Sequence, residues 1–112
     1  MNKTILITGA AKRIGKEIAL TYSDLGWNII IHFNSSKDDA EKLANRINSK
    51  NPNTAKIIQA NLDVDSEVTR LVDEAKGLFE TIDILVNNAS TFYPTPIEDI
   101  SLEHWTNLVG SN

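Results

Sequence analysis

Short apolar runs alternate with longer amphipathic segments along the chain, four times over. The short runs, rich in β-branched residues, predict strands over 4–7, 28–33, 54–60 and 82–86. Apolar residues at helical spacing predict helices over 14–25, 36–47, 65–79 and 101–109. Because strands and helices alternate strictly, the strands should pair in parallel through right-handed crossovers. The pattern therefore predicts a doubly wound α/β sheet with helices on both faces, ending after the fourth strand and helix.

Local signals mark the ends of these elements. Gly26 stands where the first helix should end. Ser36 is expected to cap the second helix, with Asp39 three residues further on. No linker or internal repeat interrupts the pattern, so residues 1–112 are expected to form one domain.

Composition narrows the possible partners. Eleven Lys and Arg against fifteen Asp and Glu give a net charge of −4, so nucleic acid is not an expected partner. The chain has no cysteine, and two histidines, His32 and His104, are too few to suggest a metal site. No apolar run has the length of a membrane span, and the first residues do not form a signal peptide. We therefore expect a soluble cytoplasmic protein.

The segment after the first strand is typical of a dinucleotide-binding turn. It reads Thr-Gly-Ala-Ala-Lys-Arg-Ile-Gly over 8–15 and opens directly into a helix. Gly9 permits a sharp turn, and Gly15 lets the helix pack close to the sheet. The free N–H groups at the helix start can then bind a pyrophosphate. The alternative is an ordinary turn with Lys12 and Arg13 on its solvent side.

The segments after the second and fourth strands add to this prediction. The first reads His-Phe-Asn-Ser-Ser-Lys over 32–37 and lacks the acid that usually holds the adenosine ribose of NAD. Its hydroxyls and lysine favour the 2′-phosphate of NADP, unless Ser36 serves only as a helix cap. The second reads Asn-Asn-Ala-Ser over 87–90, and its small and amide side chains suit hydrogen bonds to a ribose. His32 is interpreted as a strand-end histidine and not as a catalytic one.

Together these segments resemble the short-chain dehydrogenase/reductase family, over the whole chain. The family usually has glycine where this sequence has Arg13. The arginine variant, combined with Asn-Asn-Ala-Ser-Thr-Phe-Tyr-Pro-Thr-Pro over 87–96, is similar to the pteridine reductases and the related bacterial dihydromonapterin and dihydrofolate reductases. The resemblance implies a Rossmann fold, NADPH as cofactor, a pterin as substrate and a homo-oligomer, which is a tetramer in the intact family.

The resemblance also implies roles for individual residues. Arg13 would lie between the cofactor phosphates and the pterin, where its guanidinium can donate to both. Ser90 would hydrogen-bond the pterin or the cofactor, and Phe92 would stack against the pterin ring. Asn112 matches the family asparagine that supports a proton relay. The residues expected to contact NADPH are Gly9, Lys12, Arg13, Ile14, Gly15, Asn34, Ser35, Ser36, Asn61, Leu62, Asn88, Ala89, Ser90 and Ser111.

Two departures from these reductases concern the adenosine end of the cofactor. Asn61, at the position that meets adenine together with Leu62, stands where an aspartate is common. Ser35 stands where an arginine often binds the 2′-phosphate, which predicts weaker binding of this phosphate. Lys37 could partly compensate for the missing arginine.

The family's proton donor is missing from this chain. That donor is a tyrosine followed four residues later by a lysine, whereas Tyr22 is followed by Gly26 and Tyr93 by Ile97. We therefore expect the amino-terminal part of a reductase, inactive by itself. A reductase for another carbonyl, such as a ketoacyl thioester, and a non-catalytic dinucleotide-binding module are the alternatives.

A truncated sheet also leads to an expectation about its edge. With the strands in the order 3-2-1-4, the strand over 82–86 would be unpaired on one side. It carries no central charge or proline to discourage pairing. We therefore expect the 112-residue chain to self-associate through this edge, to retain the rest of the reductase non-covalently, or to remain partly unfolded.

Overall fold

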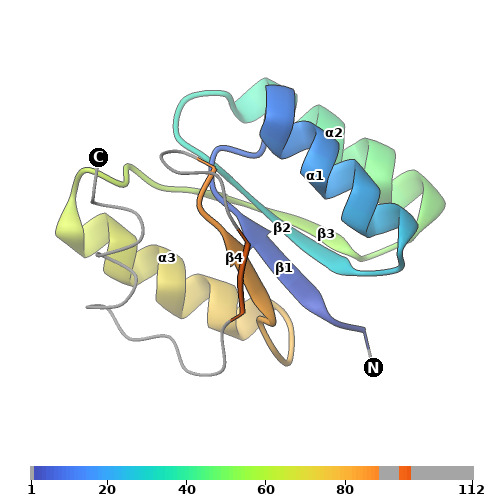
Figure 1. Ribbon diagram of the computed structural model, residues 1–112. Helices are drawn as coiled ribbons and strands as arrows, with labels where there is room; N and C mark the ends of the chain where they lie inside the picture. The colour runs from blue at the N-terminus through green and yellow to red at the C-terminus, as the bar shows by residue number, and fades with distance from the viewer. Residues whose placement is uncertain (1, 89–93, 97–112) are drawn as a thin grey trace.

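Three helices and five strands make up residues 2–88 and 94–96, the part of the chain that the computed structural model describes. In chain order they are β1 (Thr4–Ile7), α1 (Arg13–Asp24), β2 (Asn28–Phe33), α2 (Lys37–Lys50), β3 (Ala55–Gln59), α3 (Asp65–Leu78), β4 (Ile84–Val86) and β5 (Pro94–Pro96). The strands form one sheet in the order β3-β2-β1-β4-β5, and β1 to β4 are parallel (Figure 1). The predicted α/β fold with a parallel sheet is confirmed.

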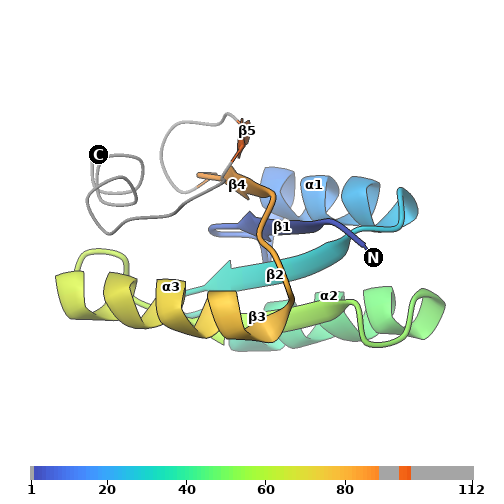
Figure 2. The ribbon, with the colours of Figure 1, turned by 90° about the horizontal axis from the view of Figure 1, so that it is seen from below.

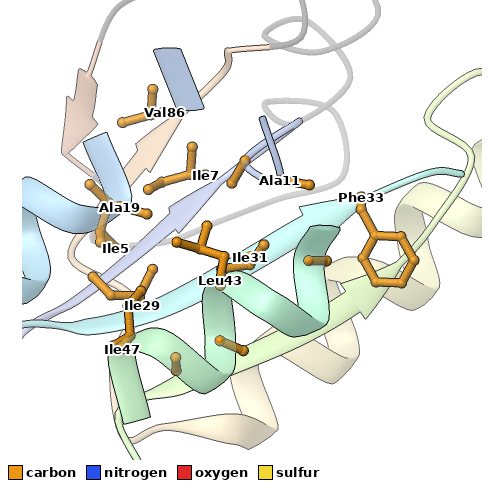
Figure 3. Close-up of a cluster of buried hydrophobic side chains, with 14 residues drawn as sticks. Ile5, Ile7, Ala11, Ala19, Ile29, Ile31, Phe33, Leu43, Ile47 and Val86 are labelled. Carbon is orange, nitrogen blue, oxygen red and sulfur yellow. The ribbon is translucent and has the colours of Figure 1, made fainter. Parts of the chain in front are cut away.

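Both faces of the sheet are buried under helices. On one face, alternate residues of β1 and β2 pack against α1 and α2, in a cluster that includes Ile5, Ile7, Ala19, Ile29, Ile31, Leu43 and Ile47 (Figure 3). On the other face, the intervening residues pack against α3, in a cluster that includes Leu6, Ile30, Ile58, Leu71 and Leu85. Because β1, β2 and β4 need apolar side chains on both faces, they appear in the sequence as nearly continuous apolar runs, whereas β3 exposes Lys56 and Gln59.

The register of the parallel strands brings their carboxyl ends to one edge of the sheet. Ile7 at the end of β1 lies opposite Ile31 of β2 and Val86 of β4, and Ile31 in turn lies opposite Ile57 of β3. The β1–α1 and β2–α2 connections therefore begin side by side, as Figure 1 shows. Ligands of doubly wound sheets bind at this edge.

The ends of the helices follow the sequence signals in part. Gly26, with φ of +88°, follows the end of α1 as predicted. Ser36 occupies the N-cap position of α2, but its side chain makes no capping hydrogen bond, so the expected cap is wrong. Its backbone angles, φ −91° and ψ 55°, depart from the extended conformation in which a capping hydroxyl reaches the first N–H groups.

The expected free edge at β4 is also wrong. Leu85 of β4 pairs with Thr95 of β5, and the two strands are antiparallel. Figure 2 shows β5 beside β4. Pro-Thr-Pro has no strand pattern of its own, but proline is compatible with an edge strand because its missing N–H can face away from the sheet. Two prolines also leave few donors for a further strand. The structure thus removes the reason given for self-association through β4.

The helix predicted over 101–109 lies outside the described residues. Of the helices within 2–88, none combines the length and the apolar character needed to cross a bilayer.

Candidate functional site

Hydrogen bonds to two neighbouring segments hold the turn between β1 and α1. On the β2 side, the Gly9 N–H donates to Nδ1 of His32 at 3.0 Å, and the Ala10 N–H donates to the His32 carbonyl at 3.0 Å. On the β4 side, Nδ2 of Asn88 donates to the Gly9 carbonyl at 3.1 Å. Gly9 has φ of +61°, a conformation that glycine adopts without steric cost. Hydrogen bonds therefore hold both the N–H and the carbonyl of Gly9.

Gly15 allows α1 to begin directly against this turn. A Cβ atom at position 15 would lie 2.7 Å from the Gly9 oxygen, 2.8 Å from Cα of Ala10 and 2.8 Å from Nδ2 of Asn88. Two of these neighbours are backbone atoms and cannot move aside independently. Glycine is thus required at this position by the close approach of helix and turn.

The first turn of α1 carries no group that would compete with an anion. Lys12 at its N-cap position makes no side-chain capping bond, and the first turn has no acidic residue. The start of a helix presents free N–H groups and a partial positive charge. These features make it suited to a phosphate group.

Arg13 adopts a conformation that normally requires glycine. Its φ is +56°, in the left-handed region, at the position where the family resembled by the sequence usually has glycine. A side chain in this region costs about 1 kcal/mol. The exposed Arg13 side chain stands at the junction of turn and helix.

A crevice of about 520 Å³ lies between the β1–α1 turn and the end of β2. It brings together most of the residues expected to contact NADPH. Its lining consists of Gly9, Ala11, Lys12, Arg13, Ile14, Phe33, Asn34, Ser35, Ser36 and Asn88. Gly15 lies just below it, in contact with Gly9.

Charged side chains from two helices meet beside this crevice. Nζ of Lys12, before α1, lies 3.4 Å from Oδ2 of Asp39 in the first turn of α2. Nζ of Lys37 lies 3.8 Å from Oε1 of Glu41 and does not line the crevice. The Lys12–Asp39 pair could not be predicted from the sequence, because no local spacing relates two residues on different helices.

Asn61 and Leu62 do not line the crevice. Oδ1 of Asn61 accepts the N–H of Asp63 at 3.0 Å, and this bond shapes the turn into α3. Leu62 is half-buried against the apolar cluster below α3. Their expected contact with adenine therefore stays a prediction.

His32 lies beneath the crevice and is almost fully buried, with 3% of its surface exposed. Its Nδ1 accepts the Gly9 N–H, and its Nε2 lies 2.9 Å from the Ala60 carbonyl at the end of β3. Burial lowers the pKa of the imidazole below its ordinary value, because the charged form loses its hydration, although the Ala60 carbonyl opposes this shift. The sequence placed this histidine at the strand end but gave no sign of its two partners.

Polar side chains also join β1 to the segment after β4. Oγ1 of Thr8 donates to Oδ1 of the buried Asn87 at 3.3 Å. The predicted site residues Ala89, Ser90, Phe92, Ser111 and Asn112 lie outside the described residues.

The parallel sheet with flanking helices and a glycine turn at its carboxyl edge is a Rossmann-like α/β fold. The sequence model of the family described as short chain dehydrogenase matches residues 3–112. The chain therefore belongs to that family, whose members use nicotinamide dinucleotides.

Several curated relatives agree with this membership. The chain is 33% identical over its full length to the 3-oxoacyl-(acyl-carrier-protein) reductase FabG of Staphylococcus epidermidis, of which it covers 46%. It is 38% identical to pteridine reductase 1 of Leishmania tarentolae, over 82% of this chain and 38% of that protein. It is 34% identical to a short-chain type dehydrogenase/reductase of Picea abies, over 98% of this chain and 43% of that protein. The chain thus spans less than half the length of these relatives.

Proposed function

We propose that this chain forms the NADPH-binding part of a reductase that acts on a pterin. The observation that carries the proposal is the crevice in which the Gly9 turn and the start of α1 face Ser35 and Ser36. The helix start suits the pyrophosphate. The two hydroxyls and Lys12 suit a 2′-phosphate, and the lining described above contains no carboxylate to repel one. These features favour NADPH over NADH.

Arg13 supports the choice of a pterin as substrate. Arg13 adopts a left-handed conformation that glycine would adopt at lower cost. Such strained residues cluster at functional sites, which supports a functional role for the guanidinium. Its planar set of donors can serve a phosphate and a flat heterocycle together. The resemblance to pteridine reductases and the 38% identity with one of them point the same way.

In the proposed reaction, NADPH would, when bound, supply a hydride to the carbon of a C=N bond of the pterin, and the nitrogen would take its proton from the tyrosine that the family resemblance implies and that residues 1–112 do not contain. The Gly9 turn and the start of α1 would bind the pyrophosphate. Arg13, between the cofactor phosphates and the pterin, would orient the pterin ring against the nicotinamide. We assign Ser90 to a hydrogen bond with the pterin or the cofactor, Phe92 to stacking on the ring, and Asn112 to a proton relay. The proposal includes a homo-oligomeric assembly in the cytoplasm.

A ketoacyl reductase is the second candidate, favoured by the match of the FabG relative along the whole chain. An aliphatic ketone needs neither a forked guanidinium nor an aromatic wall, so Arg13 and Phe92 favour the pterin. A non-catalytic dinucleotide-binding module would bind NADPH without reducing either substrate.

Steady-state kinetics of the protein encoded by the complete gene test the proposal. NADPH and NADH are compared as donors, each with a dihydropterin, a dihydrofolate and a ketoacyl thioester. We expect reduction of the pterin with a higher kcat/KM for NADPH. A preference for NADH would contradict the cofactor assignment, and reduction of the thioester alone would contradict the substrate assignment.

A further inference from the structure

His32 connects two loops that leave different strands. Its Nδ1 accepts the N–H of Gly9 at 3.0 Å, after β1, and its Nε2 contacts the carbonyl of Ala60 at 2.9 Å, after β3. These partners lie 23 and 28 residues away along the chain. A single buried side chain therefore ties both neighbours of β2 to each other.

The two partners require one tautomer of the imidazole. The Gly9 N–H can only donate, so Nδ1 must carry a free lone pair. The Ala60 carbonyl can only accept, so Nε2 must carry the proton. His32 is thus a neutral Nε2–H imidazole with both ring nitrogens in use, and neither is left to act as an acid or base on a substrate.

The position of Gly9 in turn determines where α1 begins. His32 holds the Gly9 N–H, Asn88 holds the Gly9 carbonyl, and that same carbonyl lies against Gly15 of α1. A shift of Gly9 would move the turn relative to the first N–H groups of the helix. Ala60 directly precedes Asn61 and Leu62, which the family resemblance assigns to adenine.

We propose that His32 is a positioning residue for the dinucleotide, holding the pyrophosphate turn and the adenine-side segment in their binding arrangement before the cofactor arrives. This inference rests on the proposed function, because it assumes that the crevice binds NADPH. Preorganised backbone donors bind more tightly, since no ordering of the turn opposes binding.

Three substitutions separate the two hydrogen bonds of His32. His32→Asn places an amide oxygen near the position of Nδ1 and keeps an acceptor for Gly9. His32→Gln extends an amide nitrogen toward the position of Nε2 and keeps a donor for Ala60. His32→Phe keeps the ring volume and loses both bonds, so it serves as the matched control for packing.

The dissociation constant for NADPH is measured for each variant of the protein encoded by the complete gene, beside its Tm. We expect His32→Gln and His32→Phe, which both lose the acceptor for the Gly9 N–H, to weaken binding about tenfold, and His32→Asn, which keeps this acceptor, to weaken it less than about threefold. If His32 served stability alone, the affinity for NADPH would fall in proportion to Tm across the three variants, regardless of which hydrogen bond each variant keeps. Equal affinities of the Asn and Gln variants, or no change in any variant, would overturn the proposal.

Amide hydrogen exchange at Gly9 in the cofactor-free protein gives a second measurement. We expect the Gly9 amide to be protected in the wild-type protein and in His32→Asn, and to exchange faster in the other two variants. Imidazole nitrogen shifts should identify the Nε2–H tautomer. An unprotected Gly9 amide or the other tautomer would overturn the role of His32. Protection with this pattern but no NADPH binding by the wild-type protein would instead overturn the proposed function.

Discussion

At Arg13 the backbone conformation and the residue type disagree. Its φ of +56° suits glycine, yet the position carries the longest cationic side chain available. Conformations of this kind persist where the surrounding structure determines them, and they gather at functional sites. Arg13 is thus both the strained residue and the proposed contact of the pterin.

Replacing Arg13 should therefore separate stability from activity. We expect Arg13→Gly to raise the free energy of unfolding by about 1 kcal/mol, because the left-handed conformation loses its steric cost. The same variant should lose most of its activity toward a pterin. Urea unfolding and steady-state kinetics measure the two effects. Arg13→Ala is the control, since it removes the guanidinium and keeps a Cβ atom; equal stability of the Gly and Ala variants would contradict the strain argument.

At the scale of elements, the contact between α1 and the β1–α1 turn depends on Gly15. Its neighbours at 2.7–2.8 Å include the backbone of the turn itself. Gly77, near the end of α3, offers a comparison within the same chain, because a Cβ atom added there would have no neighbour within 4 Å.

We expect Gly15→Ala to lower the free energy of unfolding by about 1–3 kcal/mol, as overpacking does, and to weaken NADPH binding. Gly77→Ala should instead be neutral or stabilise the protein by up to about 1 kcal/mol, because alanine is the better helix former. Thermal unfolding of both variants checks this contrast. A stable Gly15→Ala variant with unchanged affinity would show that helix and turn can separate at no cost.

The two helix starts beside the crevice are linked by the Lys12–Asp39 pair. Both side chains are largely exposed, at 61% and 43%, so the pair contributes little to stability. We expect Asp39→Asn to release Lys12 for the 2′-phosphate and to strengthen NADPH binding about two- to threefold, with NADH unaffected. Isothermal titration measures both cofactors. Glu41→Gln, which releases Lys37 outside the crevice, is the matched control and should leave the affinity for NADPH unchanged.

At the scale of the whole molecule, the buried His32 links stability to pH. Its pKa in the folded state lies below the ordinary value of 6.5, so the unfolded chain takes up its proton first as the pH falls. The stability held by the neutral ring is therefore complete well above pH 6.5 and is lost as the pH falls toward the folded-state pKa.

We expect the free energy of unfolding to fall between pH 7.5 and pH 5.5, with a contribution from His32 of at most about 1.4 kcal/mol per pH unit. Urea unfolding across this range measures the slope. His32→Phe should show a smaller slope, because this variant has no titrating group at position 32. Parallel slopes for the two proteins would exclude His32 as the origin.

The sequence was sufficient for much of this architecture because the decisive patterns are local. Continuous apolar runs located β1 and β2, and the Gly9–Gly15 spacing located the turn against which α1 packs. β5 was missed because Pro-Thr-Pro carries no strand pattern, and only its pairing with β4 makes it a strand. The partners of His32 and the pairing of Lys12 with Asp39 were missed because they join residues more than twenty positions apart.

The central place of β1 has a consequence for the order in which the chain folds during synthesis. β1 emerges from the ribosome before the other strands of the sheet, and β2 can pair with one of its edges early, because only α1 and its two turns separate them. The other edge of β1 can pair only after β4 (Ile84–Val86) has been synthesised. The hydrogen bond between Asn88 and Gly9 likewise joins residues 79 positions apart. Contacts of such long sequence separation form late, because closing the intervening loop costs entropy. Until β4 has left the ribosome, the nascent chain exposes an apolar strand edge of β1. A chaperone would have the most surface to bind during this time.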